Sequence, residues 1–299
     1  MPHPVPSLRI LLDAIVDYAG LFPPAALDMP SAVREYARVR ASEDRWALGR
    51  FVVPAARLGE MEQAVTALGA GAARGWSLSV LVPLGKWEEI AALPAFNERH
   101  AAAHDLAVDT VETRAASPTD VDAAADVTPR GFTTYVEVAL DDTMPALLER
   151  IAMRGLRAKV RTGGVTPEQF PAPAAVARFL VACAALQLPF KATAGLHHPL
   201  RGEYPLTYET GSACGTMFGF LNVFLAAAAA RQGAAESEVA ALLVEGAPGA
   251  FCFDDAGVTW QGRRFSSAEL AALRARGAIA FGSCSFREPV TDLRALGLL

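Results

Sequence analysis

Short apolar runs alternate with amphipathic segments along almost the whole chain. Unbroken or alternating apolar runs of a few residues are typical of strands, whereas apolar residues three and four positions apart are typical of helices. Eight runs are predicted to be strands: residues 14–21, 50–54, 78–83, 106–113, 133–140, 157–162, 189–195 and 278–283.

Helical spacing fills most of the intervals between these runs. The expected helices cover residues 31–41, 59–68, 87–100, 144–154, 174–186 and 217–231, with a short last helix at 291–298. Eight successive strand and helix units in a chain of this length are typical of a (β/α)8, or TIM, barrel with one core. A doubly wound open sheet is the alternative. We predict an α/β protein with a single TIM-barrel domain over residues 1–299.

Two segments depart from a minimal barrel. Between the seventh helix and the eighth strand, an insertion at about 233–266 predicts a helix at 236–245 followed by a small hairpin. Ser266 and Glu269 then form the pattern of a capping box that begins another helix. After the seventh strand, residues 197–216 are rich in Gly, Pro, Tyr and Thr. This long segment follows the end of the barrel at which loops build sites.

The amino-acid composition and charge indicate which classes of binding partner to expect. The chain is 52% hydrophobic with a formal net charge of -5 and no basic cluster, so we expect neither a nucleic-acid nor a membrane partner. The longest apolar stretch, residues 217–230, is shorter than the roughly 20 residues of a membrane span, which favours a buried helix. The amino terminus lacks a basic signal region, and the four cysteines form no C-x-x-C pair. These features predict a cytoplasmic protein with reduced thiols.

Lysine is rare in this chain, since only Lys86, Lys159 and Lys191 among the 27 basic residues are lysines. Where any surface cation suffices, the chain uses arginine. A lysine within a predicted strand is therefore informative, because lysine can lose its proton and act as a nucleophile whereas arginine cannot.

Alternation predicts that two lysines point into the barrel. In the sixth strand Lys159 and Arg161 share the face opposite the small apolar residues, and in the seventh Lys191, Thr193 and Gly195 share a face. Two ammonium groups in a partly dry cavity disfavour double protonation. One amine is then expected to lose its proton near neutral pH and to attack a carbonyl group, forming a Schiff base. The alternative is that each lysine only pairs with a carboxylate such as Glu137 or Asp109.

Carboxylates are expected in the same lumen. Glu137 faces inward because both of its neighbours in the fifth strand are valines. Asp109 and Glu112 lie on opposite faces of the fourth strand, and polarity does not settle which face points inward. Asp17, at the end of the first strand, is a candidate substrate contact. Each carboxylate has two alternative roles, catalysis or neutralisation of a lumen cation.

Two adjacent histidines, His197 and His198, follow the seventh strand. Side chains of adjacent extended residues point in opposite directions, so at most one is expected to face the site. With Glu137, Asp17 or Glu112, an imidazole is a candidate metal ligand or general base; the third alternative is a turn residue bonded to the backbone. Spacing does not establish three converging ligands, so the prediction contains no metal and no other cofactor.

The lysine strands carry a specific pattern. Lys159 precedes Thr-Gly-Gly-Val-Thr-Pro-Glu at 162–168, and Lys191 begins Lys-Ala-Thr-Ala-Gly. This pattern resembles the two-lysine signature of deoxyribose-phosphate aldolases and related class I aldolases, and the likeness extends to residues 16–18, 82–85, 108–111 and 282–285. The resemblance implies that Lys159 forms the Schiff base, that Lys191 lowers its pKa, and that Asp109 assists proton transfer.

The chain departs from that family at two places. Arg161 stands where the family has a small hydroxyl residue, and the seventh strand continues into Leu-His-His-Pro at 196–199 instead of a glycine-rich turn. These differences put the substrate in doubt and leave open whether the aldolase chemistry is altered.

An anion site is predicted where the eighth strand ends. Gly282, Ser283 and Ser285 lie where barrels often bind phosphate through backbone N–H groups. Arg161 and Arg201 are the nearest candidate cations and predict a phosphate or carboxylate on the substrate. The alternative is that these small residues only allow tight packing at the turn into the last helix.

Together these features predict a lyase of the Schiff-base aldolase type that acts on a small carbonyl compound with an anionic group. One alternative is a metal-dependent lyase, isomerase or hydrolase that uses His197 or His198. Another is a catalytically silent barrel that binds a ligand or a partner chain. The sequence leaves open whether the chain forms a homo-oligomer.

Overall fold

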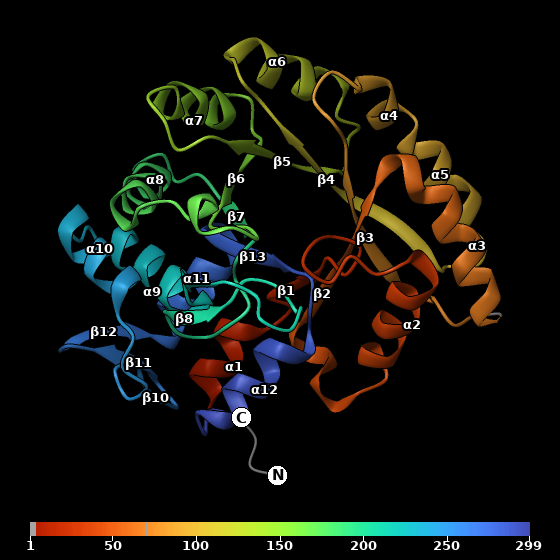
Figure 1. Cartoon of the computed structure of the whole chain (residues 1–299). Coiled ribbons are helices and arrows are strands. Elements are labelled where there is room, and N and C mark those ends of the chain that lie inside the picture. The colour runs from red at the N-terminus through yellow and green to blue at the C-terminus, as the bar shows by residue number, and fades with distance from the viewer. Residues whose placement is uncertain (1–3, 70) are drawn as a thin grey trace.

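The computed structural model describes residues 4–69 and 71–299 and shows a closed barrel of eight parallel strands surrounded by helices (Figure 1). The strand order is β1-β13-β7-β6-β5-β4-β3-β2, so the eighth predicted strand is β13. The bounds are β1 (Val16–Tyr18), β2 (Leu48–Pro54), β3 (Trp76–Leu81), β4 (Leu106–Arg114), β5 (Thr133–Val138), β6 (Arg157–Arg161), β7 (Phe190–Thr193) and β13 (Ala278–Ser283). The predicted TIM barrel is confirmed, and closure of the sheet excludes the open alternative.

Most helices lie where the periodicity predicts them. Their bounds are α1 (Pro6–Leu12), α2 (Met29–Arg40), α3 (Leu58–Leu68), α4 (Trp87–Ala91), α5 (Leu93–Ala101), α6 (Pro118–Val127), α7 (Met144–Met153), α8 (Pro173–Ala185), α9 (Phe220–Arg231), α10 (Glu236–Val244), α11 (Ser267–Arg276) and α12 (Arg287–Ala295). Short 3-10 helices are η1 (Glu43–Ala47), η2 (Ala55–Arg57) and η3 (Pro167–Gln169). The helix expected at 87–100 is divided, because Pro94 lacks an N–H and its ring excludes a continuous helix. The helices α1 and α6 were absent from the prediction.

An aromatic cluster fixes the first strands against α2. The ring of Tyr36 lies 5.3 Å from that of Phe51 in β2 and 4.7 Å from that of Trp76 in β3, and its hydroxyl donates to the carbonyl of Gly49 at 2.8 Å. Because Phe51 faces the helices, Arg50 and Val52 face the barrel interior. This packing positions β1 and β2 for the site described below.

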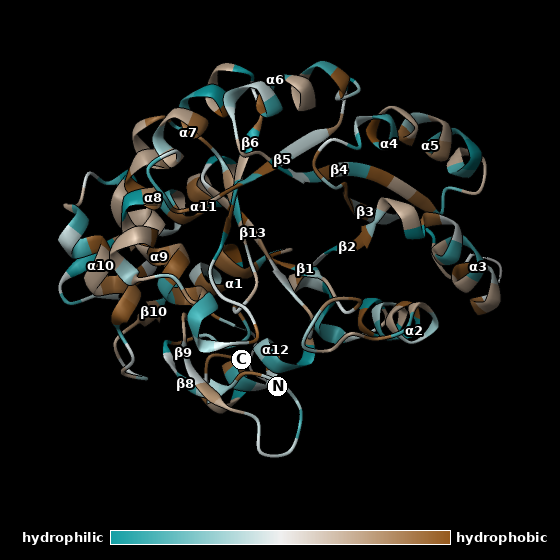
Figure 2. Cartoon of the chain, turned by 45° about the horizontal axis from the view of Figure 1, so that its top comes forward, coloured by the Kyte–Doolittle hydropathy of each residue, from teal (hydrophilic) through white to brown (hydrophobic). Residues whose placement is uncertain are grey.

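The helix α9 is a core element rather than a membrane span, as predicted. All of its residues except Arg231 are buried, and it packs against α8, α10 and α11. Hydrophobic residues accordingly dominate it (Figure 2). Within residues 4–69 and 71–299, no helix combines the length and the hydropathy needed to cross a membrane. The four cysteines are free thiols.

The insertion before β13 contains more structure than the predicted helix and hairpin. A three-stranded antiparallel sheet follows α10, formed by β10 (Cys252–Asp254), β11 (Gly257–Trp260) and β12 (Arg263–Ser266). The third strand forms because Gln261 and Gly262, both with positive φ, make a second tight hairpin turn. The predicted capping box of Ser266 and Glu269 is confirmed at the start of α11. The sheet packs against α1 and contributes nothing to the cavity described below.

Candidate active site

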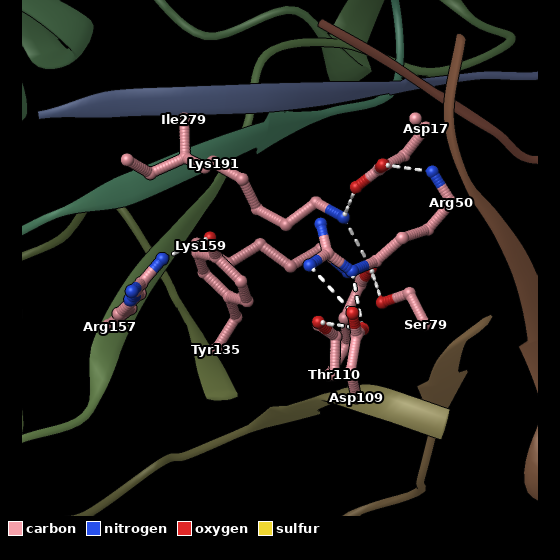
Figure 3. Close-up of polar contacts among 12 residues, drawn as sticks. Asp17, Arg50, Ser79, Asp109, Thr110, Tyr135, Arg157, Lys159, Lys191 and Ile279 are labelled. Atoms are coloured by element: carbon pink, nitrogen blue, oxygen red, sulfur yellow. Dashed lines mark hydrogen bonds and ion pairs between the residues drawn. The ribbon is translucent and has the colours of Figure 1, made fainter. Parts of the chain in front are cut away.

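The two lumen lysines lie side by side on neighbouring strands (Figure 3). Lys159 of β6 pairs in register with Lys191 of β7, and the two residues are 2% and 1% exposed. On the opposite face, Phe190 packs edge-on against Phe179 of α8, with ring centroids 5.3 Å apart. The inward orientation predicted from alternation is therefore confirmed for both lysines.

Glu112 of β4 joins the two amines. Its Oε1 accepts a hydrogen bond from Lys191 Nζ at 2.5 Å, and its Oε2 lies 2.8 Å from Lys159 Nζ. Ser79 of β3 donates to the same Oε1 at 2.6 Å. Glu112 is 2% exposed, and three side chains contact its two carboxylate oxygens.

Each lysine has a second carboxylate of its own. Lys191 donates to Asp17 Oδ2 of β1 at 2.5 Å, and Lys159 Nζ lies 3.0 Å from Glu137 Oε2 of β5. The other Asp17 oxygen accepts from the backbone N–H of Arg50 at 2.8 Å. The inward orientation predicted for Glu137 is confirmed, Asp17 also points into the lumen, and three carboxylates surround two ammonium groups.

These carboxylates outweigh the expected repulsion between the lysines. Burial alone would lower the pKa of Lys191, but Asp17 and Glu112 raise it above its usual range. Burial alone would raise the pKa of Glu112 and of Glu137, but the neighbouring cations hold both below their usual range. Lys191 is therefore a cation at neutral pH, and the amine expected to lose its proton is not Lys191.

Asp109 does not contact the lysines. It forms a bidentate ion pair with Arg50, at 2.5 and 3.0 Å, and its side chain is 40% exposed. The register between β3 and β4 shifts at this residue, since Leu78 pairs with Val108 whereas Ser79 pairs with Thr110. This irregularity lets Glu112 take the position beside the lysines. The carboxylate of β4 that contacts both amines is Glu112, whereas the resemblance gave a role in proton transfer to Asp109.

A cavity of about 360 Å³ opens at the carboxyl ends of the strands. Lys159 and Glu112 reach it, whereas Lys191 and Asp17 are not part of its lining. Its lining includes the apolar residues Phe22, Val52 and Leu81, and the exposed side chains of Arg114 and Arg161 lie at its rim. Lys159 is therefore the lysine that a bound small molecule can contact.

Only one of the two histidines faces this cavity, as predicted. His197 lines it, and its Nδ1 lies 3.0 Å from Glu288 Oε2 of α12. His198 points away, with Nδ1 2.5 Å from Asp292 Oδ2 and its ring stacked on Tyr204 at 3.5 Å. Their partners are thus carboxylates of α12 rather than Glu137, Asp17 or Glu112. In the described part of the chain, no group of three or more His, Cys, Asp or Glu residues is arranged to hold a metal ion.

The long segment after β7 reaches the site through a hairpin of β8 (Gly202–Pro205) and β9 (Cys214–Met217). At its tip, the hydroxyl of Tyr208 donates to Glu288 Oε2 at 2.9 Å, the oxygen that His197 also contacts. Thr193 and Gly282 pair across β7 and β13, and both line the cavity.

Gly195 has a structural reason for its identity. Its φ is +72°, and an added Cβ would lie 2.9 Å from the Cα of Gly163. A larger residue there would be strained and would separate two loops at the barrel rim.

The contacts at the end of β13 match tight packing. Ser283 is 2% exposed, and the hydroxyl of Ser285 accepts from the backbone N–H of Glu288, in the first turn of α12, at 3.2 Å. Arg201 stacks on Phe218, 4.9 Å from the ring centroid, and does not line the cavity. An anion cradle at these residues stays a prediction, and the carboxylate of Glu288 in the first turn of α12 disfavours it.

Comparison of the chain with protein-family models and with curated proteins gives no match. Three residues of the site were not singled out from the sequence: Arg114, which lines the cavity, Glu288, which contacts His197, and Tyr208, which contacts Glu288. The only sequence signal for Arg114 is its position at the end of a predicted strand. Glu288 and Tyr208 belong to a helix turn and a loop whose approach depends on the tertiary fold.

Proposed function

We propose that the protein is a lyase of the Schiff-base aldolase type, in which Lys159 forms an imine with a small carbonyl compound. One observation carries the proposal: Lys159 reaches the cavity while its Nζ lies 2.8 Å from one carboxylate oxygen and 3.0 Å from another. A buried amine beside such groups has an acceptor for the proton that it must lose before it attacks. Lys191, which does not line the cavity, is its electrostatic partner.

Imine formation follows from these contacts. Lys159 transfers a proton to Glu137, and its Nζ then attacks the carbonyl carbon. The carbonyl oxygen takes up the proton held by Glu137 and a second proton from Nζ and leaves as water, which gives a protonated imine. The cation at Lys191 offsets part of the negative charge of Asp17 and Glu112, and this favours loss of the proton from Lys159.

Cleavage needs a second proton acceptor. The bond that breaks joins the carbon attached to the imine carbon to the carbon that carries a hydroxyl group. Its electron pair moves toward the imine and gives an enamine. The hydroxyl group on the departing carbon loses its proton, and that carbon becomes a carbonyl carbon. His197 lines the cavity and Glu288 holds its Nδ1, which leaves Nε2 for this proton. His197 then returns this proton to the enamine carbon, and attack of water on the resulting imine releases the second product and restores Lys159.

Reductive trapping tests the proposal. Borohydride is added to the protein with a panel of small aldehydes and ketones, and the intact mass is measured. We expect an increase equal to the reduced imine with at least one compound. If some of these compounds raise the melting temperature but none forms an adduct, the result would instead favour a catalytically silent barrel that only binds a ligand.

Glu112 is expected to set the pH at which the imine forms. In Glu112→Gln each lysine keeps one carboxylate, but Lys159 loses an anion 2.8 Å away that favours its ammonium form over the free amine. The midpoint of the alkaline rise in trapping rate should move down by about one pH unit or more. Glu149→Gln, at an exposed position of α7, is the matched control and should leave the midpoint in place. A midpoint that stays unchanged in Glu112→Gln would show that the two groups are not coupled.

His197 is expected to affect proton transfer but not imine formation. In His197→Asn the carbon attached to the imine carbon should exchange its protons for solvent deuterium about 100-fold more slowly, the usual contribution of a general acid or base. The exchange is measured before borohydride is added. Reductive trapping at Lys159 should persist. His104→Asn, on the exposed surface, serves as the control. Unaltered exchange in His197→Asn would assign the proton to another group.

A further inference from the structure

Two guanidinium groups lie at the rim of the cavity that Lys159 reaches. Arg114 is the last residue of β4 and Arg161 the last residue of β6, on either side of β5. Glu137 of β5 lies between them, with its Oε1 3.7 Å from Arg114 Nη2 and 3.4 Å from Arg161 Nε. The two arginine side chains are 63% and 47% exposed, so both remain accessible to a ligand.

One carboxylate serves three cations at this point. Oε1 of Glu137 faces both arginines, and its Oε2 lies 3.0 Å from Lys159 Nζ. Among residues 4–69 and 71–299, no other carboxylate lies within 4.0 Å of either guanidinium. Each guanidinium carries five N–H donors in a planar fork, and one shared oxygen leaves most of them for a further acceptor. The rim therefore presents unmatched donors to an anion.

The spacing limits where that anion sits on a substrate. The amine lies 3.0 Å from one oxygen of the Glu137 carboxylate, and the guanidinium groups lie 3.4 and 3.7 Å from the other, so one carboxyl group and a contact distance on each side separate Lys159 from either arginine. A substrate whose carbonyl carbon is at Lys159 therefore brings a directly attached carboxylate to the arginines. A phosphate several carbon atoms away would lie beyond them.

We propose that the carbonyl substrate is a 2-oxo acid, whose carboxylate is bound by Arg114 and Arg161 while its keto group meets Lys159. This assignment rests on the proposed function. The apolar side of the cavity, formed by Phe22, Val52 and Leu81, takes the carbon chain of the acid. The anion is thus bound between β4 and β6 instead of at the end of β13.

Matched ketones test the carboxylate requirement. Pyruvate and its neutral methyl ester are trapped with borohydride at equal concentration in the wild type, in Arg114→Gln, in Arg161→Gln and in the double variant. We expect the wild type to prefer pyruvate, and each substitution to reduce pyruvate trapping by about tenfold or more. Trapping of the ester in the same variants corrects for any change in the reactivity of the Lys159 amine. Arg130→Gln, at an exposed position before β5, is the control and should keep the preference.

Two further probes separate the outcomes. Oxalate has no keto group, and it should raise the melting temperature of the wild type but not of the double variant. Oxalate stabilisation without trapping of any carbonyl would retain the anion site and overturn the Schiff-base function. An undiminished pyruvate preference in the double variant would overturn the 2-oxo acid assignment. Stabilisation by oxalate that persists in the double variant and disappears in Ser283→Asp would also overturn this assignment. Better trapping of glyceraldehyde 3-phosphate than of pyruvate would overturn it as well.

Discussion

Lys159→Arg is expected to abolish reductive trapping and to reduce turnover by a factor on the order of 10⁴ or more. Arginine keeps a positive charge between Glu112 and Glu137, so the charge balance of the lumen is retained. It cannot supply an unprotonated nitrogen near neutral pH, because the guanidinium does not lose its proton. The change therefore separates nucleophilic attack from electrostatics. Intact mass after borohydride treatment is the measurement, with the melting temperature as the check of folding.

Lys86→Arg is the matched control for this substitution. Lys86 is largely exposed and pairs loosely with Glu88 at 3.8 Å, far from any role in the lumen. We expect its variant to be trapped like the wild type. An adduct of undiminished yield in Lys159→Arg would assign the imine to a different amine.

Lys191→Met is expected to have the largest effect on stability. It removes the cation that lies 2.5 Å from both Asp17 and Glu112, and all three side chains are almost fully buried. Loss of one partner from a buried ion pair leaves an uncompensated charge and costs about 3–5 kcal/mol. Urea unfolding of the two proteins measures the difference. Asp17→Asn combined with Lys191→Met removes one of the stranded carboxylates and should recover part of the loss; no recovery would contradict the charge argument.

The pH dependence of this difference has a defined sign. The pKa of Lys191 is raised in the folded protein, so its contribution is fully present below its unfolded value of about 10.5 and is lost as the pH rises through the folded value. The pKa of Glu112 is lowered, so its contribution is present above about 4.5 and is lost as the pH falls toward the folded value. The stability gap between wild type and Lys191→Met should therefore be constant near neutral pH and narrow below about pH 4.5. If Lys191→Met can still be trapped with borohydride, the midpoint of the alkaline rise in its trapping rate should move to higher pH.

Alternation was enough to predict the barrel and the direction of the lysines. Lys159 and Lys191 sit among small and aromatic residues that must face the helices, so period two left them only the lumen. Glu137 followed in the same way from its two valine neighbours. These predictions succeeded because parallel strands in a barrel are apolar on their outer face, and every polar residue on such a strand stands out.

The other contacts of the site depend on features of the fold that leave no recognisable pattern in the neighbouring sequence. The irregular register at Asp109 decides that Glu112 meets the lysines, and one extra residue in a strand cannot be recognised from polarity. The charge of the lumen was therefore misjudged: two lysines predict repulsion, but Glu112 joins them. Likewise, the contact of Glu288 with His197 brings together residues 91 positions apart. Only the closed fold places them within reach.

The location of the reduced adduct tests the central claim most directly. Wild-type protein is trapped with pyruvate or another reactive carbonyl compound, digested, and mapped by tandem mass spectrometry. We expect a single modified residue, Lys159, in the peptide that spans β6. Modification confined to Lys86, to Lys191 or to the amino terminus, with Lys159 unmodified, would contradict it.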